Sequence, residues 1–200
     1  RRGGLTVMCD MGANPDVEPW DMVRFAQMGA AYAACVLGVD EPSVGLLSNG
    51  TEEHKGSAFT QSCYPLRAEH VPGFAGNCEG GDITSGSVDV VVCNGFDGNI
   101  ALKSIEGAAK FMMGELKAGM TANLKGKVAA LLMRNMLRAL KHKLSGDAKG
   151  GAILLGLRGV VMIGHGATSA EAVKNGTLAC AEAVRARLVE RVRESRGLEA

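Results

Sequence analysis

The chain has 200 residues, 46% of them hydrophobic and 4% aromatic, with a formal net charge of +1. This length allows one large domain or two small ones with a real core, and the balanced charge excludes the basic signature of a nucleic-acid-binding protein. We expect neither a signal peptide nor a membrane-spanning segment, because no apolar run has the required length.

The hydrophobic pattern alternates between two rhythms along the chain. Short apolar runs, of which 88–93 is the richest in β-branched residues, predict strands at 5–9, 42–47, 88–93 and 159–163, and we expect a short edge strand at 74–77. Helical spacing predicts helices at about 19–37, 57–63, from Ile100 onward, and 170–193. Strands that alternate with helices predict an α/β protein with a parallel sheet and right-handed crossovers.

The cysteines and the first residues of the chain are also informative. Six cysteines occur without a C-x-x-C pair, so we expect reduced thiols in a cytosolic protein rather than disulfides or zinc ligands. Cys9 and Cys93 fall in predicted buried strands. The chain opens with Arg1-Arg2-Gly3-Gly4 directly before a core strand and without Met, which we interpret as a fragment whose upstream part is missing.

The joint after the strand at 88–93 gives the strongest local signal. Asn94-Gly95 and Asp97-Gly98 are turn pairs, so the sequence predicts a loop at 94–99 that opens into a helix at Ile100. Backbone N–H groups and the positive helix end then favour an anion such as phosphate, with Lys103 reaching back to it. An ordinary strand–loop–helix joint without a ligand is the alternative.

Four predicted strands end in small polar loops. Because the carboxyl ends of parallel strands face one side, we expect these loops to form one phosphate and substrate site. No loop has the G-x-G-x-x-G or Walker A pattern, which disfavours dinucleotides and P-loop nucleotides. The candidate binding residues are Asp10, Gly12, Asn14, Asn49, Glu53, Lys55, Asn94, Gly95, Gly98, Gly166 and Thr168, beside Asn99, Lys103 and His165 as candidate catalytic residues.

Each of these residues also has a structural explanation. His165 could pair locally, Glu53 and Lys55 could pair with each other, and Asn14 and Asn99 could cap their loops.

Spaced motifs occur along nearly the whole chain. They are Asp10-x-Gly-Ala-Asn14, the stretch 44–56, Gly76-Asn77-x-Glu79, the stretch 89–103, the stretch 150–156, and His165-Gly166. This series of motifs resembles the PlsX family of bacterial phosphate acyltransferases. The chain departs from the family pattern at Asn94, Ile153 and 167–168, and the family's opening strand is absent.

The resemblance implies a three-layer α/β/α fold with a mainly parallel sheet, like isocitrate and isopropylmalate dehydrogenases and phosphotransacetylases. Residues 1–200 would be the larger, C-terminal part of this domain, with a protruding amphipathic helical region at 111–148. The implied reaction moves a long acyl chain from acyl carrier protein to inorganic phosphate, without a cofactor or metal. The acyl phosphate would feed a membrane glycerol-3-phosphate acyltransferase. A cytoplasmic homodimer in peripheral contact with the inner face of the membrane is also implied.

Phosphate is a good oxygen nucleophile, so the protein's main task would be to position it and to stabilise the developing oxyanion. The amides of Gly95, Gly98 and Gly166 and the charge of Lys103 suit that role. His165 could protonate the departing thiolate or donate to the phosphate.

The stretch 120–144 has an apolar face and a basic one at helical spacing. From 121 to 149 there are seven Lys or Arg against the single Asp147. A helix pair packed on the core or on a second subunit is one explanation, and contact with a membrane or with acidic acyl carrier protein is the other, which we favour. The candidate contact residues are Leu124, Val128, Leu131, Leu132, Met136, Arg134, Arg138 and Lys141, with Lys127 and Leu140 on the same faces.

Two other functions remain open from the sequence. One is a catalytically incomplete fragment that only dimerises and contacts a membrane or a carrier protein. The other is a metal-dependent hydroxyacid dehydrogenase of the same fold, although the clustered aspartates and Arg-rich loop that it needs are not visible.

Overall fold

The computed structural model describes residues 5–144, 150–164 and 169–195. The chain divides into two compact units. The first comprises Arg1–Ala101, Leu154–Val161 and Ala181–Ala200, and the second comprises Leu102–Ile153 and Met162–Cys180.

A four-stranded parallel sheet forms the centre of the first unit. Its order is β1 (Val7–Cys9), β4 (Val90–Val92), β2 (Val44–Leu47) and β3 (Phe74–Cys78). All three residues of β4 are fully buried, as expected for a central parallel strand that is covered on both faces. The structure confirms the predicted α/β class, the parallel sheet and the edge position of β3.

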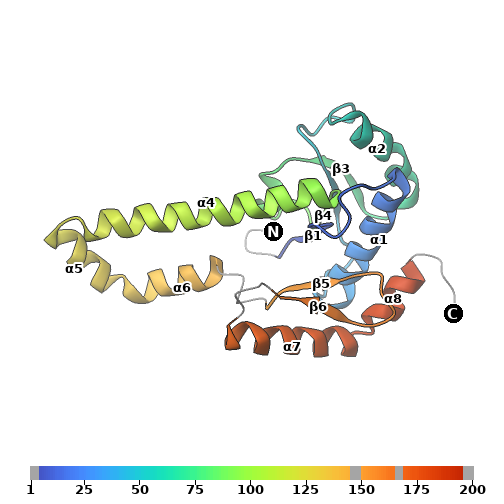
Figure 1. The fold of residues 1–200 in the computed structure, drawn as a ribbon. Helices are drawn as coiled ribbons and strands as arrows, with labels where there is room; N and C mark the ends of the chain where they lie inside the picture. Colours follow the sequence, from blue (N-terminus) through green and yellow to red (C-terminus); the bar gives the residue numbers. More distant parts are fainter. Residues whose placement is uncertain (1–4, 145–149, 165–168, 196–200) are drawn as a thin grey trace. The chain divides into compact units, whose positions relative to one another are not determined.

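Helix α1 (Pro19–Cys35) is fixed at its start and along its buried face. Pro19 occupies the first turn, and Glu18 and Asp21 form a reciprocal capping box. The helix packs on β1 and β4, and also on α2 (Ala58–His70) and α8 (Leu188–Ser195) (Figure 1). A Cβ atom added to Gly29 would lie 2.7 Å from a methyl group of Val90, so a glycine permits this close approach of α1 to the sheet.

Several predicted boundaries are wrong. Helix α2 continues to His70 through Pro65, because the tertiary packing of its later turns outweighs the cost of an internal proline. The helix predicted at 170–193 is two helices, α7 (Ala170–Arg185) and α8, with the left-handed Arg187 (φ 55°) between them. A short helix α3 (Asp82–Ser85) precedes β4.

The predicted loop at 94–99 is helical. Helix α4 spans Gly95–Thr121, so the Asn-Gly and Asp-Gly pairs lie at its start and in its first turn. Asn94 accepts a hydrogen bond on Oδ1 from the Asp97 backbone N–H (2.8 Å) and donates through Nδ2 to the Asp97 carboxylate (2.8 Å). This reciprocal bonding caps the helix, which explains why Asn and Asp residues occur there without a loop.

The second unit contains most of α4, together with α5 (Leu124–Leu132) and α6 (Arg134–Leu144), whose break lies at Met133. The stretch 120–144 is therefore not one helix with one continuous apolar face. Asn123 begins α5 by accepting the Gly126 backbone N–H on its side chain at 2.8 Å.

The strand predicted at 159–163 has a different place from the one expected. It is β6 (Val161–Ile163), and it pairs with β5 (Ala152–Leu154) in a separate two-stranded sheet. Val161 and Ile163 are exposed. In the described part of the chain, β6 does not pair with any strand of the four-stranded sheet. The apolar run at 159–163 therefore forms a strand, but not a fifth strand of that sheet.

Candidate active site

Three of the four predicted loops follow neighbouring strands of the parallel sheet and lie at its carboxyl edge. The Asp10 backbone N–H donates to the Cys93 carbonyl (2.9 Å), and the Gly95 N–H donates to the Asn14 carbonyl (2.9 Å), so the ends of β1 and β4 are tied together. The Ser48 N–H donates to the Cys78 carbonyl (2.8 Å), which ties the end of β2 to β3. This part of the predicted arrangement is confirmed.

The fourth loop holds His165, Gly166 and Thr168, and all three lie outside the described residues. Their proposed roles remain predictions.

Asp10 organises the loop after β1. Its buried carboxylate accepts the backbone N–H groups of Gly12 (2.9 Å), Ala13 (3.0 Å) and Asn14 (2.7 Å), and also the Asn14 side-chain amide (2.8 Å). Burial by itself raises the pKa of Asp10, but the hydrogen bonds from Ala13, Asn14 and Gly12 outweigh it, so the pKa lies below its ordinary value of 3.8.

This ring of donors has a consequence for phosphate binding. The backbone N–H groups of Gly12, Ala13 and Asn14 already donate to the protein's own Asp10 carboxylate. Asn14 acts as a loop cap, which was the alternative left open by the sequence. A phosphate at this edge therefore needs donors other than these three amides.

Close backbone approach explains the glycines at the start of α4. A Cβ atom on Gly98 would overlap the Asp10 backbone oxygen, and it would lie 2.9 Å from the Cys93 sulfur. A Cβ atom on Gly95 would lie 2.8 Å from the Asn14 oxygen. Asn99 is exposed, and its Cβ atom would be 3.5 Å from a Cβ added to Gly12. The side chain of Asn99 thus stands beside the first loop, where a substrate could contact it.

Lys103 is placed differently from expectation. It follows Gly95 by more than two helical turns, because α4 begins earlier than predicted. Its Nζ lies 3.1 Å from the Glu106 carboxylate in an ion pair. Its catalytic role remains a prediction.

The loop after β2 is organised mainly by its own side chains. Asn49 Oδ1 accepts the Gly56 N–H (2.9 Å), and Asn77 of β3 donates to the Glu52 carbonyl (2.7 Å). No ion pair joins Glu53 to Lys55 in this described loop, so that structural explanation for the two charges is not supported. Asn77, which the sequence analysis did not single out as a site residue, holds the loop against the sheet.

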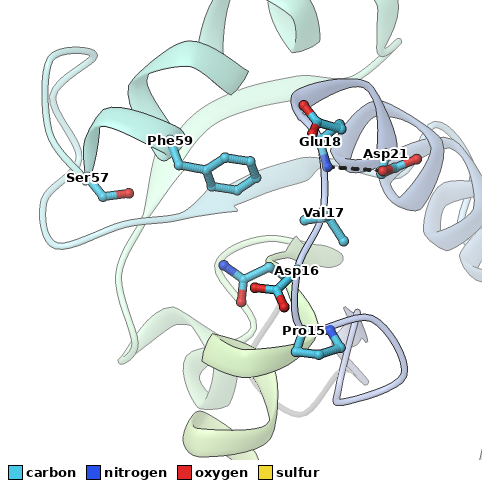
Figure 2. A pocket seen from close by; sticks show the side chains of 8 residues that line it. Pro15, Asp16, Val17, Glu18, Asp21, Ser57 and Phe59 are labelled. Carbon is cyan, nitrogen blue, oxygen red and sulfur yellow. Dashed lines mark hydrogen bonds between the residues drawn. The ribbon is translucent and has the colours of Figure 1, made fainter.

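A pocket of about 420 Å³ opens at the same edge, within the first unit. Figure 2 shows the segment 15–18 on one side of it and the start of α2 on the other. The lining residues are Pro15, Asp16, Val17, Glu18, Asp21, Ser57, Phe59 and Asn94. The sequence analysis identified only Asn94 among them. The signals available for the others were helix-start patterns, Glu18-Pro19-x-Asp21 and Ser57, which identify caps rather than a pocket.

Three cysteines of the first unit are poor nucleophiles. All six are free, and burial raises the pKa of Cys9, Cys78 and Cys93 to about 12, so their thiols stay protonated at neutral pH. The side chain of Arg67 is fully buried near them and donates to the Met22 carbonyl at 3.3 Å. Burial lowers its pKa to about 10.

The described residues contain no group of His, Cys, Asp or Glu side chains that could hold a metal ion. No described helix combines the length and apolar character required to cross a bilayer.

Comparison with known proteins identifies the chain's relatives. A family model described as fatty acid synthesis protein matches residues 1–191. A phosphate acyltransferase of Desulforudis audaxviator is 46% identical over 186 residues, which are 93% of this chain and 56% of that protein. Phosphate acyltransferases of Brevibacillus brevis and Thermobifida fusca are each 40% identical, over 97% and 94% of this chain and 58% and 53% of theirs. The chain therefore spans about half the length of these relatives.

Proposed function

Because the chain belongs to the PlsX family, whose model is described as fatty acid synthesis protein, we propose that it takes part in acyl transfer to inorganic phosphate for phospholipid synthesis. The observation that carries this proposal is the 46% identity over 186 residues to a protein named phosphate acyltransferase. The acyl donor is acyl carrier protein loaded with a long chain, as the family resemblance implies. The relatives do not favour the hydroxyacid dehydrogenase alternative.

The proposed reaction needs few protein groups. A phosphate oxygen attacks the thioester carbonyl carbon, the carbon–sulfur bond breaks, and the thiolate leaves with a proton to become a thiol. Asn99 stands beside the first loop, where a substrate could contact it. Lys103 is assigned to the developing oxyanion and His165 to the departing sulfur, as in the expectation from sequence.

Other parts of the proposal follow from the family resemblance. They are a three-layer α/β/α arrangement like that of isopropylmalate dehydrogenases, with a protruding helical segment, a homodimer, and peripheral contact with the membrane and with glycerol-3-phosphate acyltransferase. The four-stranded parallel sheet is compatible with the fold part of this proposal.

The reaction is tested by incubating the chain with acyl carrier thioester and phosphate, and by trapping acyl phosphate with hydroxylamine. We expect hydroxamate that depends on both substrates. Binding of the carrier without any hydroxamate would instead support the catalytically incomplete fragment.

Replacing Lys103 with alanine tests its assigned role. We expect turnover at saturating substrates to fall about 10-fold or more, because the loss of one contact to a developing oxyanion costs a few kcal/mol. Lys103→Arg should not restore full turnover, since a planar guanidinium does not reproduce the geometry of an ammonium group. Lys110→Ala, an exposed lysine of the same helix, is the matched control. Equal turnover of Lys103→Ala and the control would make Lys103 a surface residue.

A second function, membrane contact by α5 and α6, is favoured by the exposure of their large apolar side chains. Leu124, Leu131 and Leu132 are 77%, 69% and 81% exposed. Lys127, Arg134, Arg138 and Lys141 on the same two helices are exposed cations. An exposed apolar set with nearby cations is the composition of a helix that lies in a membrane surface.

Leu132→Glu is expected to release the protein from anionic vesicles, as measured by co-sedimentation, and to leave solution activity intact. The change removes apolar burial and adds a charge that anionic lipid repels. Leu178→Glu, an exposed leucine of α7, should leave vesicle binding unchanged. If Leu132→Glu breaks a dimer or unfolds the protein, the apolar residues belong to an ordinary packing surface.

A further inference from the structure

The pocket between residues 15–18 and the start of α2 is lined by both apolar and acidic side chains. Pro15, Val17 and Phe59 supply carbon surface, and Asp16, Glu18 and Asp21 supply carboxylates. Figure 2 shows the ring of Phe59 directed across the pocket toward Val17. Its volume of about 420 Å³ lies within the range of small-molecule sites, roughly 300–1,000 Å³.

Two of the acidic lining residues, Glu18 and Asp21, are held in position by the start of α1. The Glu18 backbone N–H donates to Asp21 Oδ2 at 3.1 Å, and Asp21 Oδ1 accepts from Arg24 at 2.7 Å. Glu18 in turn accepts the Asp21 backbone N–H as part of the capping box. Asp16 is exposed and its carboxylate is held by no hydrogen bond or ion pair in this described segment, so it can accept from a ligand.

The negative charge of the pocket lining bears on which substrate of the proposed reaction binds there, phosphate or the thioester donor. No Lys or Arg lines the pocket, and although Asp21 is paired with Arg24, the carboxylates of Asp16 and Glu18 repel an anion at close range. Phosphate is therefore disfavoured here. A neutral ligand that carries N–H donors and hydrocarbon matches this mixed lining, because carboxylates accept hydrogen bonds and Phe59 offers apolar area.

We propose that this pocket binds the neutral, amide-containing pantetheine arm of the thioester donor, and that phosphate binds elsewhere on the same sheet edge. This inference rests on the proposed function. Amide N–H groups of the arm donate to the lining carboxylates, with Asp16 the unengaged acceptor, and the aliphatic part of the arm packs between Phe59 and Val17. Asn94, the residue that precedes α4, also lines the pocket, so a bound arm lies beside the carboxyl edge of the sheet.

The kinetic test uses acyl-pantetheine as the donor and compares one variant of an apolar lining residue with one variant of an acidic lining residue. Phe59→Ala should raise the KM for acyl-pantetheine about 10-fold and leave the KM for phosphate within about 2-fold, because it removes the aromatic side of the pocket. Phe111→Ala, an exposed phenylalanine in the second unit, should change neither KM.

Asp16→Arg separates the two substrates most sharply. This variant should raise the KM for acyl-pantetheine and leave the KM for phosphate unchanged. A lower KM for phosphate in Asp16→Arg, or an unchanged KM for acyl-pantetheine in both pocket variants, would overturn the assignment.

A binding arm distinguishes this inference from the proposed reaction. Pantetheine alone, titrated into the wild-type chain and followed by isothermal calorimetry, should bind, and the binding should weaken about 10-fold in Phe59→Ala and also weaken in Asp16→Arg. If the wild type makes no acyl phosphate but pantetheine binds in this pattern, the reaction is wrong and the pocket assignment stands. If acyl phosphate forms but pantetheine binds the wild type and both variants equally, the pocket assignment is wrong.

Discussion

Replacing Gly98 with alanine is expected to lower the free energy of unfolding by about 3 kcal/mol, at the upper end of the usual cost of overpacking. The added methyl group would overlap the Asp10 backbone oxygen and press on the Cys93 sulfur, 2.9 Å away. Neither neighbour can yield easily, because the Asp10 N–H is bonded to the Cys93 carbonyl at the sheet edge. Urea unfolding followed by circular dichroism measures the change.

Gly107 provides the matched control, since it lies in the same helix and has no atom within 4 Å of an added Cβ. Gly107→Ala should stabilise the protein by up to about 1 kcal/mol through helix propensity alone. If both variants shift the midpoint equally, the close contact of α4 with the first loop is not formed in solution. Displacement of α4 in Gly98→Ala should also move Asn99 away from Gly12 and reduce activity.

Asp10→Asn is expected to destabilise the protein by about 2 kcal/mol at neutral pH. The carboxylate accepts four hydrogen bonds, and an amide in its place turns an –NH₂ group toward N–H donors. Urea unfolding at pH 7 measures this loss. Asp16→Asn, an exposed carboxylate of the following segment, is the control and should change stability little.

The same residue predicts a pH dependence. The folded pKa of Asp10 lies below the ordinary 3.8, so the unfolded chain binds the proton more tightly. The stabilisation is fully present above pH 3.8 and is lost as the pH falls through the lower folded pKa. The difference in unfolding free energy between wild type and Asp10→Asn should therefore shrink on acidification. A difference that stays constant down to the acid limit would show that Asp10 carries no charge-dependent stabilisation.

The sheet could be predicted from sequence because its evidence is local. A central parallel strand needs a short β-branched run, and Val90–Val92 is one. The start of α4 could not be predicted, because Asn-Gly and Asp-Gly pairs are turn signals in isolation. The spacing of Asn94 and Asp97, three residues apart as in a capping pair, was the clue to the helix.

The candidate site was predicted only in outline. The carboxyl edge and its loops follow from parallel strands, and this part is confirmed for the loops after β1, β2 and β4. The sequence did not reveal which group accepts the hydrogen bonds of the first loop's backbone N–H groups. The acceptor is the Asp10 carboxylate, around which the loop folds back. The pocket at Phe59 joins two helix starts far apart in sequence, and no local pattern marks such a meeting.

The most direct test of the proposed acyl transfer follows the oxygen atoms of phosphate. Acyl carrier thioester is incubated with the chain and with phosphate that carries oxygen-18 at every position, and the product is weighed by mass spectrometry. Attack of a phosphate oxygen on the thioester carbonyl predicts acyl phosphate that keeps the whole label, because only sulfur leaves. Free fatty acid alone, or acyl phosphate that has lost one labelled oxygen, would contradict the account.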